Sequence, residues 1–203
     1  MTDERIGQFL NTMFDLVVIA SSAGGLKALS QVLSGLEEDF PAAVVIVQHV
    51  QSERESLMAG ILANRTQLHV KSAEAGDRLE PGSVLIAPPD FHTILDSSGR
   101  IVLQDSAPIK FSRPAADPLF ESAAALFGPR TIAVVLTGRG HDGSRGAVAI
   151  HNGGGFVIAQ DENSSAYFSM PESAIDTGVV NLVLPVEKIA GALKNLVLTG
   201  ASS

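Results

Sequence analysis

The 203-residue sequence contains no cysteine and no tryptophan, and aromatic residues make up only 5% of it. Without cysteine the chain can form no disulfide, carry out no thiol chemistry and build no cysteine-based zinc site. So few aromatic side chains offer little to a base-stacking surface of the kind that binds single-stranded nucleic acid. Several classes of site are therefore excluded before any motif is considered.

Positive charge is also scarce, with 14 Lys and Arg against 22 Asp and Glu, a formal net charge of −8. This balance argues against nucleic-acid binding, because the phosphate backbone attracts basic surfaces. The sequence has no apolar run long enough to cross a bilayer, so we expect no membrane insertion. Since there is also no cysteine and no apolar leader near the N-terminus, we expect a cytoplasmic location.

Strand-like and helix-like segments alternate from Leu16 to the C-terminus, which is typical of a mostly parallel sheet covered on both faces. The expected strands are Leu16–Ala20, Ala42–Val47, His69–Ser72, Val84–Ile86, Ile132–Leu136, Phe156–Ala159 and Leu182–Leu184. The expected helices are one with Leu26, Leu29, Leu33 and Leu36 on one face, one capped by Ser52 and Glu55, one carrying Leu119, Phe120 and Leu126, and one over Val186–Leu198. Turn residues between His92 and Leu103 add a β-hairpin.

These patterns predict an α/β fold: a single doubly wound, mostly parallel sheet with an added antiparallel β-hairpin. The length suits one domain over 1–203, with a core from about residue 15 to residue 198. We expect residues 1–14 and 199–203 to be loose ends.

Ser22 lies in Ser21-Ser22-Ala23-Gly24-Gly25, directly after the first expected strand and at the start of the first expected helix. A hydroxyl in such a turn lies beside free backbone N–H groups and the positive end of the helix dipole. It can act as a nucleophile with an oxyanion site if a base is near. The serine could equally cap the helix, and the turn could hold a phosphate. The turn alone leaves these three interpretations open.

Two further polar residues follow expected strands. His49 comes after the second strand, and Asp142 ends the glycine-rich loop after Ile132–Leu136. Alone, each has an ordinary interpretation, a structural polar residue for the histidine and a turn or cap for the aspartate. In open parallel sheets, however, ligands bind at the carboxyl ends of strands. Serine, histidine and aspartate at three such ends are the residue types of a charge-oriented hydrolase.

A nucleotide site makes different demands. A dinucleotide-binding turn needs Gly-x-Gly-x-x-Gly and an acidic residue after the second strand, whereas Ser21 or Ser22 takes the first glycine position and the second strand ends in His49. The sequence also lacks a Walker-type Gly-Lys-Ser/Thr and a Gly-x-Ser-x-Gly elbow. The remaining histidines show no paired ligand spacing, so we predict no metal site and no cofactor; they are His69, His92, His141 and His151.

Taken together, these segments resemble the catalytic domain of the chemotaxis protein-glutamate methylesterases (CheB). The resemblance runs from about Leu16 to the closing helix. It is carried by Ser21–Gly25, Gln48-His49 and Leu136–Gly143, with further similar stretches at Ile86–Asp90 with His92, Arg113-Pro114, Ile158–Gln160 and Met170-Pro171.

The resemblance implies that Ser22 is the nucleophile, His49 the general base and Asp142 the residue that orients the imidazole. It also implies hydrolysis of glutamyl methyl esters on methylated chemoreceptor-like proteins, with deamidation of glutamines as a second activity. For the oxyanion we expect backbone N–H groups of the serine turn at Ala23 and of the loop Gly138–Gly140. Arg139 would add positive charge near the anion, hold the product carboxylate, or simply face solvent.

The sequence departs from the family pattern at four points. Ala23 replaces the usual threonine, Arg139 stands where methionine is usual, and Val50–Glu53 replaces the Pro-rich stretch that often follows the histidine. As the fourth departure, we expect that no receiver domain precedes Leu16. We therefore expect a stand-alone form whose regulation involves a separate receiver or chemosensory protein. The missing threonine also motivates an alternative, a non-catalytic adaptor of the same fold that binds a signalling partner.

Overall fold

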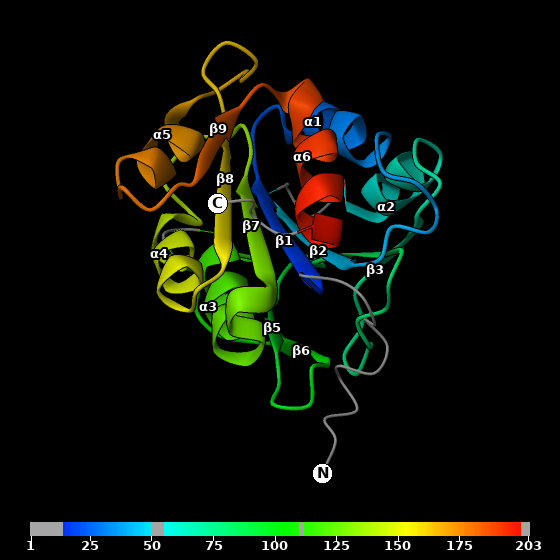
Figure 1. The fold of residues 1–203 in the computed structure, drawn as a ribbon. Coiled ribbons are helices and arrows are strands. Elements are labelled where there is room, and N and C mark those ends of the chain that lie inside the picture. The colour runs from blue at the N-terminus through cyan, green and yellow to red at the C-terminus, as the bar shows by residue number, and fades with distance from the viewer. Residues whose placement is uncertain (1–13, 50–54, 110–111, 200–203) are drawn as a thin grey trace.

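The structure is a computed structural model that describes residues 14–49, 55–109 and 112–199 (Figure 1). Within them, seven parallel strands form one sheet in the order β3-β4-β2-β1-β7-β8-β9. These strands are β1 Leu16–Ser21, β2 Ala43–Gln48, β3 His69–Ser72, β4 Ser83–Ile86, β7 Thr131–Val135, β8 Phe156–Gln160 and β9 Leu182–Leu184. A separate antiparallel hairpin pairs β5 (His92–Leu95) with β6 (Ile101–Gln104). The predicted fold class is confirmed.

Helices cover both faces of the sheet (Figure 1). One face carries α1 Gly25–Leu33, α2 Glu55–Ala63 and α6 Val186–Thr199, and the other carries α3 Ala116–Phe127, α4 Ser144–Asn152 and α5 Ser169–Ile175. Of the helices described, none is both long and apolar enough to span a membrane.

The central strands are apolar throughout because each of their faces lies against a helical layer. In β1, Val17 and Ile19 belong to the core that includes α1 and α6, whereas Leu16 and Val18 belong to the core that includes α3 and α4. All six residues of the strand are buried. Side chains alternate between the faces of a strand, so a strand buried on both faces becomes a continuous apolar run. This is why the central strands are recognisable in the sequence.

The ends of the chain differ from the expectation. Phe14 is buried and packs edge-to-face on Phe156, with ring centroids 6.4 Å apart, so it is not part of a loose end. Helix α6 continues through Thr199. Leu36 lies beyond the end of α1 and is buried even so. The expected capping residue Ser52 lies outside the described residues.

The two central strands lead to opposite faces of the sheet. β1 and β7 are neighbours, but α1 follows β1 onto one face while α4 follows β7 onto the other. Where following helices diverge in this way, a crevice opens at the carboxyl ends of the two strands. The N–H of Ser22 donates to the carbonyl of Thr137 across this point, at 3.0 Å. Residues that follow β1 and β7 therefore meet at one place.

Asp15 and Arg130 close the opposite edge of the same two strands. The Nε of Arg130 donates to Oδ2 of Asp15 at 2.6 Å, and its Nη2 donates to Oδ1. Asp15 is 2% exposed, and its hydrogen bonds are the main cause that raises the pKa of Arg130. The pair is bidentate, and the side chain of Asp15 is 2% exposed, whereas that of Glu37, the partner of Lys194, is 60% exposed. The two cations are about equally exposed, at 32% and 35%.

We expect Arg130→Met to lower the free energy of unfolding by about 2–3 kcal/mol, because it removes the arginine partner of a buried carboxylate. Lys194→Met removes the same charge from an exposed pair and should leave the free energy of unfolding nearly unchanged. Urea denaturation of both variants measures the difference. Equal costs would show that Arg130 contributes no more than a surface pair.

Candidate active site

His49 and Asp142 are in direct contact, although they lie 93 residues apart in the sequence. His49 follows β2, and Asp142 lies two residues before α4. The Nε2 atom of the histidine lies 2.7 Å from Oδ2 of the aspartate. Two of the three residues expected from the sequence are thus hydrogen-bonded at the carboxyl edge of the sheet.

The carboxylate of Asp142 is buried at the N-terminus of α3. Its Oδ2 accepts the N–H of Ala116 at 2.6 Å, and its Oδ1 accepts the N–H groups of Asp117 and Gly143 at 3.2 and 3.0 Å. Burial raises the pKa of Asp142, but the hydrogen bonds from His49 and from the backbone outweigh it and hold the pKa below its ordinary value. The group is therefore a fixed carboxylate at neutral pH.

Ser22 lies beside His49 because their strands are paired. Ser21 and Gln48 are register partners, and the N–H of His49 donates to the carbonyl of Ser21 at 3.0 Å. With Nε2 bonded to Asp142, Nδ1 is the ring nitrogen left for the hydroxyl. The Oγ of Ser22 has no hydrogen-bond partner within the described ranges. Contacts between nucleophile and base are often open without substrate, and such an arrangement tightens as substrate binds.

Gln48 ties the serine turn to the histidine, a role that the sequence analysis did not assign. Its Oε1 accepts the hydroxyl of Ser21 at 2.5 Å, and its Nε2 donates to the carbonyls of Ser22 and His49 at 2.8 and 2.9 Å. A Cβ atom on Gly25 would lie 2.0 Å from Oε1, so only glycine fits there. The position of Gln48 at a strand end beside His49 is the signal that could have identified it.

Asp117 plays a part equivalent to that of Asp142, and the sequence pattern did not point to it. It lies in α3 and is fully buried, and its Oδ1 accepts the N–H groups of Gly143 and Gly146 at the start of α4, at 3.0 and 2.9 Å. Asp142, just before α4, in turn binds the start of α3. Each carboxylate thus stabilises the N-terminus of the other helix, where the backbone N–H groups and the dipole favour negative charge. An acidic residue in the first turn of α3 was the available signal.

The loop after β7 is held by the segment that leads into α5. The N–H of Gly138 donates to the carbonyl of Tyr167 at 2.9 Å, and the N–H of Gly140 donates to Oγ of Ser169 at 3.2 Å. These two groups were expected to meet an oxyanion, but here they bind Tyr167, which precedes α5, and Ser169, the first residue of α5. The N–H groups of Ala23 and Arg139 remain the expected donors.

Gly138 also allows the loop to approach the serine. A Cβ atom at this position would lie 2.8 Å from Cβ of Ser22 and 2.2 Å from Sδ of Met170. Arg139, the next residue, is exposed, and its guanidinium carbon lies 4.4 Å from the centroid of the Tyr167 ring. A cation therefore stands on an aromatic ring at the rim of the candidate site.

His92 has a structural position. It is 1% exposed, its Nδ1 accepts the N–H of Ala115 at 3.1 Å, and its Nε2 donates to the carbonyl of Ala107 at 3.2 Å. Because Ala115 directly precedes α3, His92 supports the helix start that binds Asp142. The described residues contain no group of three or more His, Asp or Glu side chains arranged to hold a metal ion.

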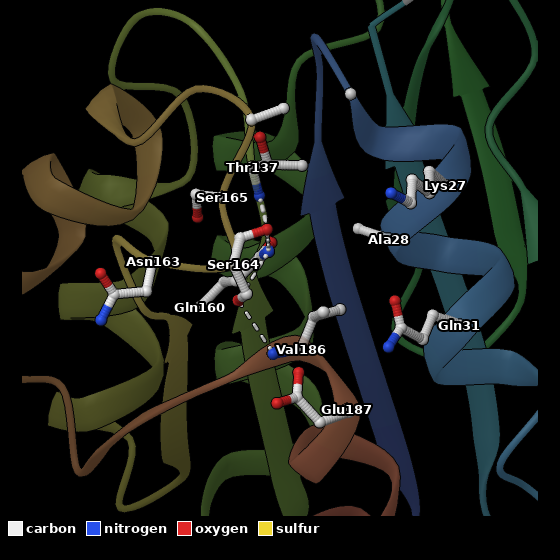
Figure 2. A pocket seen from close by; sticks show the side chains of 12 residues that line it. Lys27, Ala28, Gln31, Thr137, Gln160, Asn163, Ser164, Ser165, Val186 and Glu187 are labelled. Carbon is white, nitrogen blue, oxygen red and sulfur yellow. Dashed lines mark hydrogen bonds between the residues drawn. The ribbon is translucent and has the colours of Figure 1, made fainter.

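A groove of about 410 Å³ lies behind the serine turn, between α1 and the segment before α5 (Figure 2). Figure 2 shows Lys27 and Gln31 along α1 on one side and Thr137 and Gln160 at its floor. Gln160 accepts the N–H of Thr137 at 2.8 Å. The hydroxyl of Thr137 donates to the carbonyl of Ala23 at 3.1 Å. The floor of the groove therefore supports the turn Ser21–Gly25. The residues that line the groove do not include the candidate triad.

Ionisation of Asp142 should contribute to stability in a pH-dependent way. Because its folded pKa lies below the ordinary value of 3.8, the contribution is present above that value and is lost as pH falls through the folded pKa. Asparagine does not ionise, so the variant Asp142→Asn lacks this contribution at every pH. We expect the difference in unfolding free energy between the wild type and Asp142→Asn to stay constant above about pH 5 and to narrow as pH falls below it. Denaturant titrations above and below this pH measure it, and a difference that stays constant throughout would contradict the prediction.

Known proteins are similar to this chain in sequence and in fold. The family model described as CheB methylesterase matches residues 17–193. A protein-glutamate methylesterase/protein-glutamine glutaminase 2 of Anaeromyxobacter dehalogenans is 44% identical over 90% of this chain and 53% of its own length. A protein-glutamate methylesterase/protein-glutamine glutaminase of Pyrococcus horikoshii is 42% identical over 85% of this chain and 48% of its own. The chain thus spans about half the length of the curated relatives it matches.

The crystal structure of the Thermotoga maritima CheB methylesterase catalytic domain superposes with a TM-score of 0.87 at 40% identity, covering 90% of this chain and 98% of that one. The resemblance found in the sequence is therefore confirmed. Since the family model spans most of the sequence and the fold reproduces that of a solved catalytic domain, this chain belongs to the CheB methylesterase family.

Proposed function

We propose that this chain is a serine esterase that hydrolyses γ-glutamyl methyl esters on chemoreceptor-type proteins, releases methanol, and deamidates glutamine side chains at the same site. The observation that carries the proposal is the 2.7 Å contact between His49 and the buried Asp142 at the strand end next to Ser22. A carboxylate, an imidazole and a hydroxyl in this order are the parts of an acyl-transfer site.

In the proposed reaction, Nδ1 of His49 takes the proton of Ser22 as the hydroxyl oxygen attacks the ester carbonyl. A tetrahedral intermediate forms, and its oxyanion accepts the N–H groups of Ala23 and Arg139. The histidine then gives the proton to the departing methoxide, which leaves as methanol. Water, activated by the same imidazole, cleaves the acyl-enzyme and regenerates the serine. Asp142 keeps Nε2 protonated and stabilises the imidazolium that forms at each step.

The surroundings suit this chemistry. Asp142 is an ionised acceptor held by three backbone N–H groups, so it can fix the orientation of the histidine ring. Gln48 bonds to both the serine turn and the histidine backbone, so it fixes their relative placement. Preorganised groups of this kind need no rearrangement as charge develops.

The test is methanol release from carboxyl-methylated receptor fragments, together with labelling by a fluorophosphonate probe. We expect methanol release, and labelling of the wild type at Ser22 identified by peptide mass. An adaptor of the same fold would bind the fragments but release no methanol and take no label. Absence of both signals would overturn the esterase proposal in favour of that alternative.

A further inference from the structure

Arg139 is an exposed cation whose side chain is held against an aromatic ring. Its guanidinium carbon lies 4.4 Å from the centroid of the Tyr167 ring, which is 40% exposed. Stacking on an aromatic face orders an arginine without neutralising its charge. Within the part of the chain that the structure describes, no carboxylate pairs with Arg139. The charge is therefore available to a ligand.

Tyr167 is itself tied to the loop that carries Arg139. Its N–H donates to the hydroxyl of Thr137 at 2.9 Å, and its carbonyl accepts the N–H of Gly138 at 2.9 Å. The aromatic ring and the cation above it thus belong to one hydrogen-bonded unit. An ordered side chain loses less conformational entropy on binding than a free one, so the stacking of Arg139 on Tyr167 favours the binding of a ligand.

The same unit touches the candidate nucleophile, because the residue before Arg139 is Gly138, which lies directly against Ser22. The scissile group of the proposed substrate is a neutral ester, so the ground state offers no charge to a cation at the reacting atoms. The guanidinium of Arg139 is held on the ring of Tyr167, to the side of Ser22. It is therefore placed to bind a negatively charged group of the substrate that lies beside the ester. The chain carries a net charge of −8, which repels acidic partners elsewhere on its surface.

We propose that Arg139, seated on Tyr167, is a specificity residue that binds a carboxylate next to the scissile glutamyl ester, so that the enzyme selects acidic segments of its protein substrate. The inference rests on the proposed esterase function. A guanidinium donates two parallel hydrogen bonds to a carboxylate, which gives direction as well as attraction.

Two synthetic peptides test the proposal. Both carry one glutamyl methyl ester; one has glutamates beside it and the other has glutamines. For Arg139→Met, which keeps the backbone N–H and an apolar side chain on the ring but no charge, we expect kcat/KM to fall about 5- to 20-fold more on the acidic peptide than on the neutral one. Arg139→Lys should recover part of the loss. Lys194→Met removes the same charge on the remote helix α6 and should behave as the wild type.

A binding measurement separates recognition from chemistry. With Ser22→Ala protein as the background, the affinity for the acidic peptide should fall on adding Arg139→Met, and the preference should weaken as salt rises from about 0.05 to 0.5 M. Equal losses on both peptides would mean that Arg139 acts at the ester itself and would overturn the inference. Absence of hydrolysis of either peptide by the wild type would instead overturn the esterase proposal.

Discussion

Ser22→Ala is expected to lower the rate of methanol release by about four to six orders of magnitude, while the protein keeps its fold. The variant removes the atom that forms the acyl-enzyme, so only oxyanion stabilisation and substrate binding remain. Ser22 is only partly buried, and its Oγ has no partner among the described residues, so its loss should leave packing and stability nearly unchanged. Single-turnover methanol release and thermal unfolding measure the two effects.

Two other serines serve as comparisons for that variant. Ser34 lies at the C-terminus of α1, where its exposed hydroxyl donates to the carbonyl of Gln31, so Ser34→Ala should be active as the wild type. Ser21→Ala removes the hydrogen bond to Gln48 and should lower the rate by a smaller factor, about ten-fold, through misplacement of the turn. Near-normal activity of Ser22→Ala would eliminate the proposed mechanism.

The sheet could be predicted from the sequence because its central strands are buried on both faces. The run Leu16–Ala20 shows this pattern, and its residues divide between two cores in the structure. Helices α4 and α5 are harder to recognise, since α4 contains Gly146 and α5 is short and includes Pro171. The single-domain boundary at 1–203 stays a prediction.

For the candidate site, the residue types and their order along the chain were predictable, and the resemblance implied the contact of Asp142 with His49. The backbone hydrogen bonds that hold the site together were not predictable. Placement at strand ends singled out Ser22, His49 and Asp142 as candidates, since parallel strands deliver their carboxyl ends to one edge. The acceptors that the backbone N–H groups of Gly138 and Gly140 bind were not predictable. Gly138 binds the segment before α5 and Gly140 binds Ser169 at its start, contacts that depend on how parts of the chain distant in sequence pack. Asp117 escaped notice for the same reason, because its partners lie at the start of another helix.

His49→Ala is expected to reduce methanol release by a factor similar to that of Ser22→Ala, because the hydroxyl is then left without a base. Ser22 and His49 are proposed to act in the same step, so removing both should cost little more than removing one. The double variant should be at most a few-fold slower than either single variant. Added imidazole should restore part of the activity of His49→Ala and none of that of Ser22→Ala. Rate measurements with and without imidazole give all of these comparisons.

The stability of His49→Ala needs separate control because Asp142 loses a hydrogen bond in that variant. The buried carboxylate keeps its three backbone donors, so we expect a loss of about 1–2 kcal/mol rather than unfolding. His49→Gln retains a donor and should be more stable than His49→Ala but equally inactive. His151→Ala, at an exposed position near the end of α4, should leave the rate unchanged. If His49→Gln kept substantial activity, the histidine would serve as a positioning group, and the proton would have to leave Ser22 by another route.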